Sequence, residues 1–278
     1  MDQQAIRKTL SAIVATHIPR NCRKYYSRYY DSRPMVTALG IGVDPKPCEG
    51  KVIAITDEAV IVKSGRTNFE VVDLSLVSQV PDVGAKVIVT PYCRLDFNGE
   101  RPDKPNRVEH KREDGTSCFT TTVVIGSPRV KLPLGDLICP YLVDLREQIE
   151  TLLATDGFRT IANILVDAKA TDFTAVDPDE DDILGTPPTI SCNVSTEKNM
   201  GRLSIIYDRP SDLYVVELRD DDKCFWRETD VDFTSLAASI EKAIDDGTWR
   251  TIKIEVITPP SKRSIHSHLI PSAPSAIT

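Results

Sequence analysis

The sequence lacks the features of a membrane-spanning or a disulfide-bonded protein. No run approaches the length that a transmembrane helix needs, about 18 consecutive apolar residues. A short apolar run from Leu10 to Ala15 is interrupted by Ser11 and is brief for a signal peptide. The 7 cysteines stand singly and are odd in number, which is typical of neither a disulfide framework nor a zinc site. We therefore expect a cytoplasmic protein with no membrane partner and with reduced, mostly buried thiols.

The motifs of several enzyme classes are missing as well. The sequence contains no GxxxxGK[ST] phosphate-binding loop, no GxGxxG, no HExxH zinc motif and no GxSxG nucleophile elbow. Only 4 histidines are present, and His266 and His268 have no third metal ligand near them in the sequence. These absences predict no cofactor and no metal site, and they favour a protein that is not an enzyme.

Charge is distributed unevenly along the chain. The 34 basic and 41 acidic residues give a formal net charge of -7, which argues against a wholly basic nucleic-acid-binding protein. Residues 1–139 carry 20 basic and 16 acidic side chains, whereas residues 140–278 carry 14 and 25, so their net charges are +4 and -11. The basic excess is strongest in residues 1–34, with 7 basic residues and only Asp2 and Asp31 as acids. This asymmetry predicts two units with different surfaces.

The N-terminal segment combines a helix with a basic and aromatic stretch. Apolar residues at helical spacing predict a helix over residues 3–16, and Pro19 ends it. In the following PRNCRKYYSRYYDSRP, cations alternate with flat rings, which suits both phosphates and unstacked bases. The candidate nucleic-acid-binding residues are Arg20, Arg23, Lys24, Tyr25, Tyr26, Arg28, Tyr29 and Tyr30. The alternative is a helical arm that packs its tyrosines on a neighbouring domain or partner and leaves its arginines in solvent.

Residues 46–97 have a strong β pattern. Four runs rich in β-branched residues, at 51–55, 59–63, 68–72 and 86–90, are joined by short turns and predict a small SH3-like barrel or a curled sheet. Gly50-Lys51-Val52, the Thr56-Asp57 turn, Gly65-Arg66 and the segment VPDVGAKV at 80–87 resemble the KfrB-type domain. That small β module occurs in proteins of bacterial plasmids and other mobile genetic elements. The resemblance implies a fold for this segment and a genetic setting, but no catalytic residues.

The remainder predicts an acidic α+β domain. Residues 98–140 begin as a polar stretch with prolines, as in a linker. A strand is expected within them, at 118–125, where β-branched residues are frequent. Helices are expected at 143–154, 161–170 and 231–246. A meander of antiparallel strands is expected at 189–195, 202–207, 213–219 and 223–228. A last strand at 251–257 is expected to rejoin the sheet of the meander. The predicted α+β fold thus comprises a helical arm (1–45), a β-barrel (46–97), a linker plus strand (98–140), an antiparallel sheet packed with helices (141–258) and a disordered tail (259–278).

Two groups of acidic residues raise the question of metal chemistry. Asp177, Asp179, Glu180, Asp181 and Asp182 could gather a hard cation, but an EF-hand aligned from Asp177 would place Asp182 at its glycine and Pro188 at its final glutamate. We therefore expect this loop to be a solvated acidic surface for a basic partner. Asp103, Glu109 and Lys111 spell the elements of a PD-(D/E)xK nuclease without the strand-helix frame that such an enzyme needs.

Three hypotheses of function follow from these observations. The favoured one is a non-enzymatic accessory protein of a bacterial mobile element that binds nucleic acid, or a protein–nucleic-acid complex, through the basic stretch. The second is an anti-defence inhibitor whose acidic C-terminal domain binds a host immune complex by protein–protein interaction. The third is a metal-dependent nuclease or hydrolase. The sequence leaves the oligomeric state open.

Overall fold

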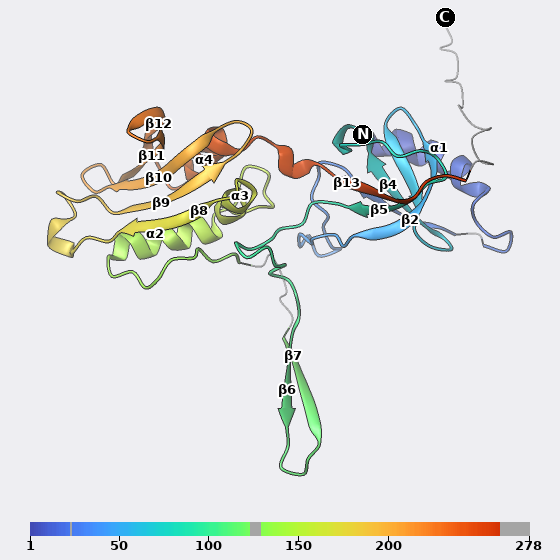
Figure 1. Ribbon diagram of the computed structural model, residues 1–278, viewed down its shortest axis with the longest axis horizontal. Coiled ribbons are helices and arrows are strands. Elements are labelled where there is room, and N and C mark those ends of the chain that lie inside the picture. The colour runs from blue at the N-terminus through green and yellow to red at the C-terminus, as the bar shows by residue number, and fades with distance from the viewer. Residues whose placement is uncertain (23, 123–128, 262–278) are drawn as a thin grey trace, which may run out of the picture. The chain divides into compact units, whose positions relative to one another are not determined.

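The computed structural model describes residues 1–22, 24–122 and 129–261, and they form an α+β protein with two compact units (Figure 1). The first unit comprises Met1–Arg33, Pro45–Tyr92 and Arg250–Thr278, and the second comprises Pro34–Asp44 and Cys93–Trp249. Neither unit is continuous in the sequence. Counted over the sequence, the first unit has 16 basic and 9 acidic residues and the second has 18 and 32, so their formal charges are +7 and -14. The charge asymmetry is therefore larger than a split at Cys139 suggests.

Helix α1 (Gln3–Ala15) confirms the predicted N-terminal helix. It begins at Asp2, whose carboxylate accepts hydrogen bonds from the backbone N–H groups of Gln4 and Ala5 at 2.8 and 3.3 Å. Its buried residues are four positions apart along one face of the helix. They are Ile6, Leu10 and Val14, and they pack on strand residues that include Ala59, Ile61, Phe69 and Val71. The first unit is therefore a helix on one face of a sheet.

The sheet of the first unit has six strands in the order β1-β4-β3-β2-β5-β13. These are β1 (Tyr26–Tyr30), β2 (Cys48–Ile55), β3 (Ala59–Lys63), β4 (Asn68–Asp73), β5 (Lys86–Thr90) and β13 (Lys253–Thr258), with a 3-10 turn η1 (Leu74–Leu76) after β4. The four predicted runs are thus confirmed as β2 to β5. The described strands form an open sheet with β1 and β13 at its edges, so of the two predicted arrangements, a small SH3-like barrel or a curled sheet, the closed barrel is not formed.

Strand β13 corrects the predicted domain division. The sequence placed a last strand at 251–257 in the meander of the C-terminal domain, but β13 pairs antiparallel with β5, so that Ile254 lies opposite Val89. Ile254 and Val89 are both buried there. An apolar alternation shows which face of a strand is covered and carries no information about which sheet the strand joins.

One glycine is required where β2 and β3 approach each other. A Cβ atom on Gly50 would lie 2.5 Å from the carbonyl oxygen of Lys63 and 2.6 Å from the Val62 side chain. Real Cβ atoms do not come this close to backbone oxygens, so only glycine fits. The role of Gly50 here is therefore steric.

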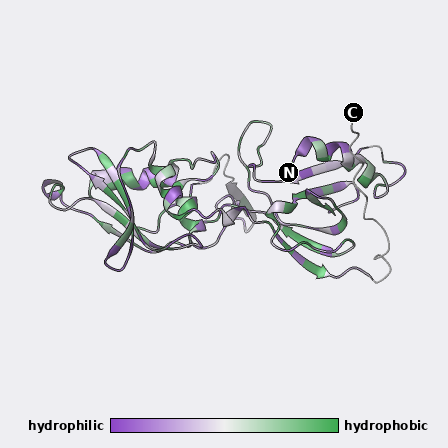
Figure 2. Ribbon diagram, turned by 90° about the horizontal axis from the view of Figure 1, so that it is seen from above, coloured by the Kyte–Doolittle hydropathy of each residue, from purple (hydrophilic) through white to green (hydrophobic). Residues whose placement is uncertain are grey.

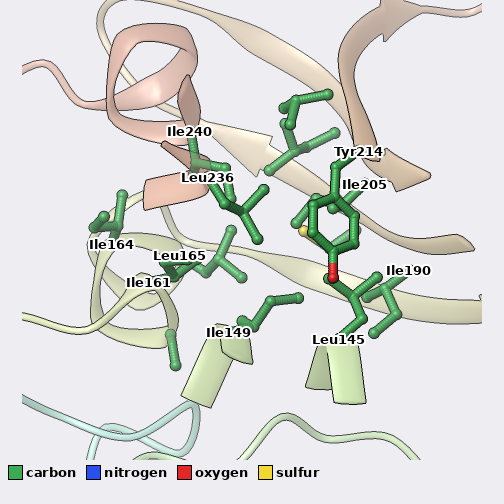
Figure 3. Packing of buried hydrophobic residues seen from close by; sticks show 14 of the residues in the cluster. Leu145, Ile149, Ile161, Ile164, Leu165, Ile190, Ile205, Tyr214, Leu236 and Ile240 are labelled. Carbon is green, nitrogen blue, oxygen red and sulfur yellow. The ribbon is translucent and has the colours of Figure 1, made fainter. Parts of the chain in front are cut away.

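The second unit contains a five-stranded antiparallel sheet in the order β12-β11-β10-β9-β8. Its strands are β8 (Thr171–Val176), β9 (Thr189–Ser195), β10 (Met200–Asp208), β11 (Leu213–Asp220) and β12 (Lys223–Val231), and its helices are α2 (Pro140–Thr151), α3 (Ile161–Asp167) and α4 (Leu236–Ile244). Side chains of all three helices and of one face of the sheet form a single core (Figure 3). The predicted helices and meander are confirmed, while β8 was not predicted. Apolar residues concentrate on the strands of both sheets (Figure 2).

A separate two-stranded hairpin lies in the stretch predicted as a linker plus a strand. It consists of β6 (Asn106–Lys111) and β7 (Ser117–Thr122), which pair only with each other among the described strands. The sequence NRVEHK of β6 has one apolar residue, so no alternation predicted this strand. Residues 123–128, where the predicted strand was to continue, and most of the predicted tail (262–278) lie outside the described residues.

Two further expectations can be compared with the structure. None of the helices in the described ranges is long and apolar enough to cross a membrane. All seven cysteines are free, but only Cys139 and Cys192 are buried, and Cys224 is exposed. The prediction of mostly buried thiols was therefore wrong.

Candidate nucleic-acid interface

The basic and aromatic stretch forms an edge strand of the first sheet and is not a free arm. Strand β1 pairs in parallel with β4, with Tyr26 opposite Asn68 and Tyr30 opposite Val72. Exposure alternates along the chain from residue 24 to residue 29. This is the period of a strand with one covered face, because successive side chains point to opposite faces of a sheet. The predicted helical arm of residues 1–45 is therefore wrong as a unit, since its helix and its strand both belong to the first unit.

Three of the four tyrosines are occupied within the fold. The ring of Tyr25 meets Phe69 edge-on, with ring centroids 5.9 Å apart. Tyr29 packs against the same apolar cluster and lies under the Arg7 guanidinium, 5.3 Å from the ring centroid. Tyr30 is 3% exposed. These rings cannot stack on bases, and the alternative that the tyrosines pack within the protein is correct for them.

The exposed alternate positions of β1 and of the residues just before it keep their cations and one ring. Lys24, Tyr26 and Arg28 are exposed at alternate positions, and Tyr26 is 70% exposed. Arg20 is also exposed, in the turn after α1. Arg23 lies outside the described residues. We name Lys24, Tyr26 and Arg28 the β1 row. It presents two cations on either side of an aromatic face, which is an arrangement suited to a phosphate backbone and an unpaired base.

A buried polar cluster lies beside Arg28 of the β1 row, on the same face of the sheet, because the register places Arg28 opposite Glu70. The Tyr30 hydroxyl and then the charge of Glu70 raise the pKa of Arg28, so this guanidinium also interacts within the protein. Glu70 and Tyr30 are each 3% exposed. The Ser64 hydroxyl donates to Glu70 Oε1 at 2.7 Å, while Glu70 Oε2 and the Tyr30 hydroxyl make no hydrogen bond of normal geometry. Burial, and then the negative charge of Glu70, raise the pKa of the Tyr30 hydroxyl. Polar atoms left unsatisfied in this way reduce stability.

The same cluster excludes Cys48 as a nucleophile. Burial, and then the charge of Glu70, raise the pKa of the Cys48 thiol to about 11. A thiol with such a pKa is protonated near neutral pH, and the thiolate is the reactive form. The Tyr30 hydroxyl also lies near enough to Cys48 to act on its pKa. Because β1 and β2 are not neighbours in the sheet order, this contact shows that the open sheet is strongly curled.

The predicted acidic surface is divided by the structure. Asp177 anchors the start of α2, since its carboxylate accepts hydrogen bonds from the backbone N–H groups of Ile138 and Cys139 at 2.8 Å each. Asp182 accepts from the Thr186 hydroxyl at 2.6 Å within its own loop. Asp179 and Asp181 are exposed. Glu180 opens the 3-10 turn η2 (Glu180–Asp182). Asp177 therefore has a structural role that its place in an acidic run did not reveal.

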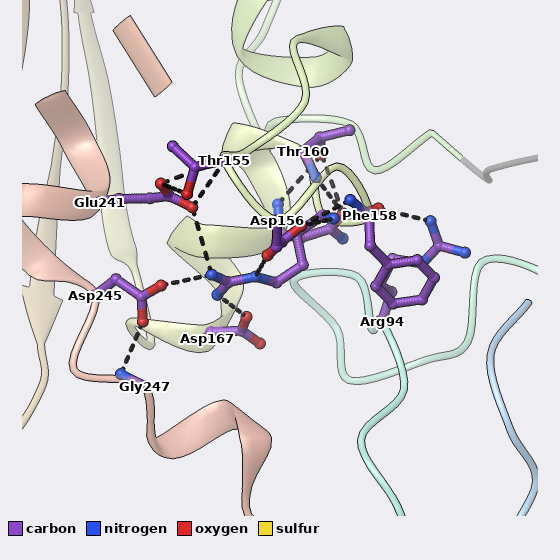
Figure 4. Close-up of polar contacts among 11 residues, drawn as sticks. Arg94, Thr155, Asp156, Phe158, Thr160, Asp167, Glu241, Asp245 and Gly247 are labelled. Atoms are coloured by element: carbon purple, nitrogen blue, oxygen red, sulfur yellow. Dashed lines mark hydrogen bonds and ion pairs between the residues drawn. The ribbon is translucent and has the colours of Figure 1, made fainter. Parts of the chain in front are cut away.

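A group of four carboxylates in the second unit surrounds Arg159 and was missed from the sequence. Figure 4 labels these carboxylates as Asp156, Asp167, Glu241 and Asp245. The Arg159 guanidinium is 1% exposed. Nε donates to Asp156 at 2.7 Å, Nη1 to Asp167 at 2.9 Å and Nη2 to Asp245 at 2.5 Å. Glu241 lies 3.6 Å from Nη2, and the Trp249 ring stacks on the guanidinium at 3.9 Å. We name these residues the Arg159 cluster. It ties α3, α4 and the chain after α4 together, and its role is structural.

A second buried arginine holds a distant segment in the second unit. Arg94 forms an ion pair with Asp44, with an Nη2 to Oδ2 distance of 3.0 Å, and donates from Nη1 to the Phe158 carbonyl at 3.0 Å. Both members of the ion pair are buried. This pair explains why residues 34–44 belong to the second unit although they precede the first sheet's strand β2.

The nuclease hypothesis finds no assembled site. The Asp103 carboxylate is held by the guanidinium of Arg101, at 2.7 Å from Nη2, which lowers the pKa of Asp103. Glu109 and Lys111 are exposed on the hairpin strand β6. Among the described residues, no three His, Cys, Asp or Glu side chains are grouped so that they could hold a metal ion. The two-carboxylate arrangement that this chemistry uses is therefore not formed by these residues.

Comparisons with protein-family models, with curated proteins and with solved structures find no match to this chain.

Proposed function

We propose that this chain is a non-enzymatic accessory protein that binds nucleic acid, or a complex containing nucleic acid, through its first unit. The observation that supports the proposal is the β1 row, an exposed Lys24–Tyr26–Arg28 alternation on an edge strand of a unit with a formal charge of +7. The KfrB-like pattern of residues 46–97 supports a setting in a bacterial plasmid or another mobile element.

Electrostatics supplies most of the affinity in this proposal. Each cation that contacts a phosphate releases condensed counterions, and this term is independent of base sequence. Only Tyr26 of the four tyrosines is free to stack on a base, so stacking adds a smaller contribution and acts only on unpaired strands. We therefore expect sequence-independent binding that weakens steeply with salt.

The test is fluorescence anisotropy of a labelled single strand and a labelled duplex over a salt series. The variant Lys24→Gln/Arg28→Gln should weaken binding to both. For each lost phosphate contact it should reduce the slope of log K against log salt by about 0.9 for the duplex and about 0.7 for the single strand. The matched control is Lys86→Gln/Lys253→Gln, which removes the same charge. The strand register places both of these lysines on the opposite face of the sheet. The control should bind like the wild type.

Tyr26→Ser separates the two contributions. It should weaken single-strand binding by about 1–3 kcal/mol if one base stacks on the ring, and leave duplex binding unchanged. Absence of binding by the wild-type chain at low salt would overturn the proposal. Equal affinity and equal salt slope for the wild type and Lys24→Gln/Arg28→Gln would overturn the assignment to the β1 row.

The charge of the second unit supports an alternative function. Its formal charge of -14 and the exposed carboxylates of Asp179 and Asp181 suit a basic partner surface, such as the nucleic-acid-binding face of a host defence complex. The variant Asp179→Asn/Asp181→Asn should then lose inhibition of that complex while Lys24→Gln/Arg28→Gln retains it. The reverse outcome would favour nucleic-acid binding.

A further inference from the structure

The hairpin β6–β7 is a two-stranded sheet without a covered face. Every residue of β7 except the half-buried Cys118 is exposed, as are residues 107–111 of β6. None of the hairpin's residues belongs to the apolar clusters found in the described parts of the chain. Isolated two-stranded hairpins are marginally stable in water, and a third strand or a packed layer normally stabilises them. The hairpin is therefore an element with room for further strands.

Strand β7 lacks the features that protect other sheet edges from pairing. Charged side chains and β-bulges are the usual protections. Among the edge strands of the described sheets, β1, β6, β8, β12 and β13 each carry at least one charged residue, and β8, β12 and β13 also have register shifts. The sequence SCFTTT of β7 has no charge, and its pairing with β6 is regular. It also combines an aromatic residue with three threonines, which are good strand formers.

The turn of the hairpin determines which backbone groups of β7 are free. Arg112 N–H donates to the Thr116 carbonyl at 2.8 Å and Gly115 N–H to the Arg112 carbonyl at 3.0 Å, with Gly115 at a φ of 82°. This is a hairpin with a glycine bulge, and it makes Arg112 and Thr116 a hydrogen-bonded pair. Because hydrogen-bonded and non-hydrogen-bonded pairs alternate, the N–H and C=O groups of Phe119 and Thr121 point away from β6. They form the free edge.

We propose that the free edge of β7 pairs antiparallel with β7 of a second copy of this chain, which joins two hairpins into a four-stranded sheet. Centred on Thr120, the pairing brings the outward groups of Phe119 and Thr121 of opposite chains together and places Thr120 opposite its own copy. Aromatic–threonine and threonine–threonine pairs across strands are favourable.

Charge favours a second copy at β7 and disfavours self-pairing at β6. Strand β6 carries Arg107, Glu109 and Lys111, and charged side chains on an edge strand disfavour its pairing with another chain. The uncharged β7 has no such penalty. The cation–aromatic contact of Arg107 with Phe119, at 3.9 Å from the ring centroid, holds the Phe119 ring toward β6 and away from the free edge.

The experiment is sedimentation velocity of the full chain over a concentration series. The wild type should form dimers. Thr120→Lys and Thr120→Glu should each raise the dimer dissociation constant at least about tenfold, because each places like charges directly opposite. An equimolar mixture of the two variants should recover the dimer, since opposite charges then face each other. Recovery also shows that both variants are folded, because two misfolded chains would not complement each other.

The control is Val108→Lys, which adds the same charge on the same face of the hairpin, opposite Thr120 on the other strand. It should leave the dissociation constant within a few-fold of the wild type. A wild-type chain that stays monomeric at every concentration overturns the proposal, and so does a mixture that fails to recover dimers. Equal loss of dimer in Val108→Lys and Thr120→Lys would overturn the assignment to the free edge of β7.

Discussion

Removal of the Arg159 guanidinium should destabilise the second unit more than any conservative change at its surface. In Arg159→Met, four carboxylates that now surround one buried cation would be left together without it. The three charge-assisted hydrogen bonds of Arg159 are worth roughly 1.5–3 kcal/mol each, but such contributions do not add. Breaking a buried ion pair by removing one partner costs about 3–5 kcal/mol. We therefore expect the free energy of unfolding to fall by about 4 kcal/mol.

Arg159→Lys tests the contribution of the guanidinium geometry, because it changes the shape of the cation and keeps its charge. A lysine keeps the positive charge but presents a single ammonium group, whereas the planar guanidinium donates in three directions to Asp156, Asp167 and Asp245. It should recover part of the loss, and we expect a decrease of about 2 kcal/mol relative to the wild type. The loss in Arg159→Lys relative to the wild type measures the contribution of the fork, and the further loss in Arg159→Met measures that of the charge.

Urea unfolding followed by tryptophan fluorescence measures these changes. Both tryptophans, Trp226 and Trp249, belong to the second unit, so the signal follows that unit. Trp249 stacks directly on Arg159, so its emission should also change in the folded variant. A loss of less than about 1 kcal/mol in Arg159→Met would refute the reasoning, because it would mean that the carboxylates are readily resolvated. An Arg159→Lys variant as stable as the wild type would refute the importance of the fork, whereas equal losses in the Met and Lys variants would refute the contribution of the charge alone.

Three further predictions concern the first unit. Tyr30→Phe removes a buried hydroxyl without a hydrogen bond, so the free energy of unfolding in denaturant should stay unchanged or rise by about 1 kcal/mol. A clear loss of stability would show that the hydroxyl has a hydrogen-bond partner. Gly50→Ala should lower the free energy of unfolding by at least about 3 kcal/mol in the same assay, because its Cβ would lie 2.5 Å from the Lys63 carbonyl oxygen. Near-normal stability would contradict this clash. Burial, followed by the charges of Lys63 and Lys51, lowers the pKa of His17 in the folded chain. The contribution of His17 to the free energy of unfolding is therefore fully present above the pKa of the unfolded chain, about 6.5, and is lost as the pH falls below it. NMR titration should place the midpoint of His17 below 6.5 and should move it upward in Lys51→Gln, and an unchanged midpoint would exclude the lysine's influence.

In the candidate site, the alternation of side chains along the sequence predicts only part of which residues are exposed. The sequence identified the stretch that carries the β1 row, because cations and rings alternate there in a way that any extended chain preserves. It could not distinguish Tyr26 from Tyr30. Their difference arises only because β1 pairs with β4, which places Tyr30 in the buried cluster with Glu70 and leaves Tyr26 at the exposed end of the strand.

The Arg159 cluster could not be predicted from the sequence for a different reason. Its members are up to 93 positions apart, from Asp156 to Trp249, and each has an ordinary local context. The acidic run at 177–182 gave a stronger local signal, yet Asp177 accepts hydrogen bonds from the backbone just before α2, while Asp179 and Asp181 are exposed. A local density of charge is visible in a sequence, whereas a charge becomes buried only when distant elements pack around it.

The sequence by itself determined the type of most elements and the polarity of the chain. Apolar spacing along a helix or a strand follows from the local geometry of the backbone, so α1, the strands β2 to β5 and the meander β9 to β12 could be recognised without knowing their partners. Only the tertiary structure decided that β1 and β13 complete the first sheet, that the unpredicted strand β6 pairs with β7 in a hairpin, and which cations remain at the surface. Strand partners depend on contacts between residues that are far apart in the chain, and local periodicity does not contain that information.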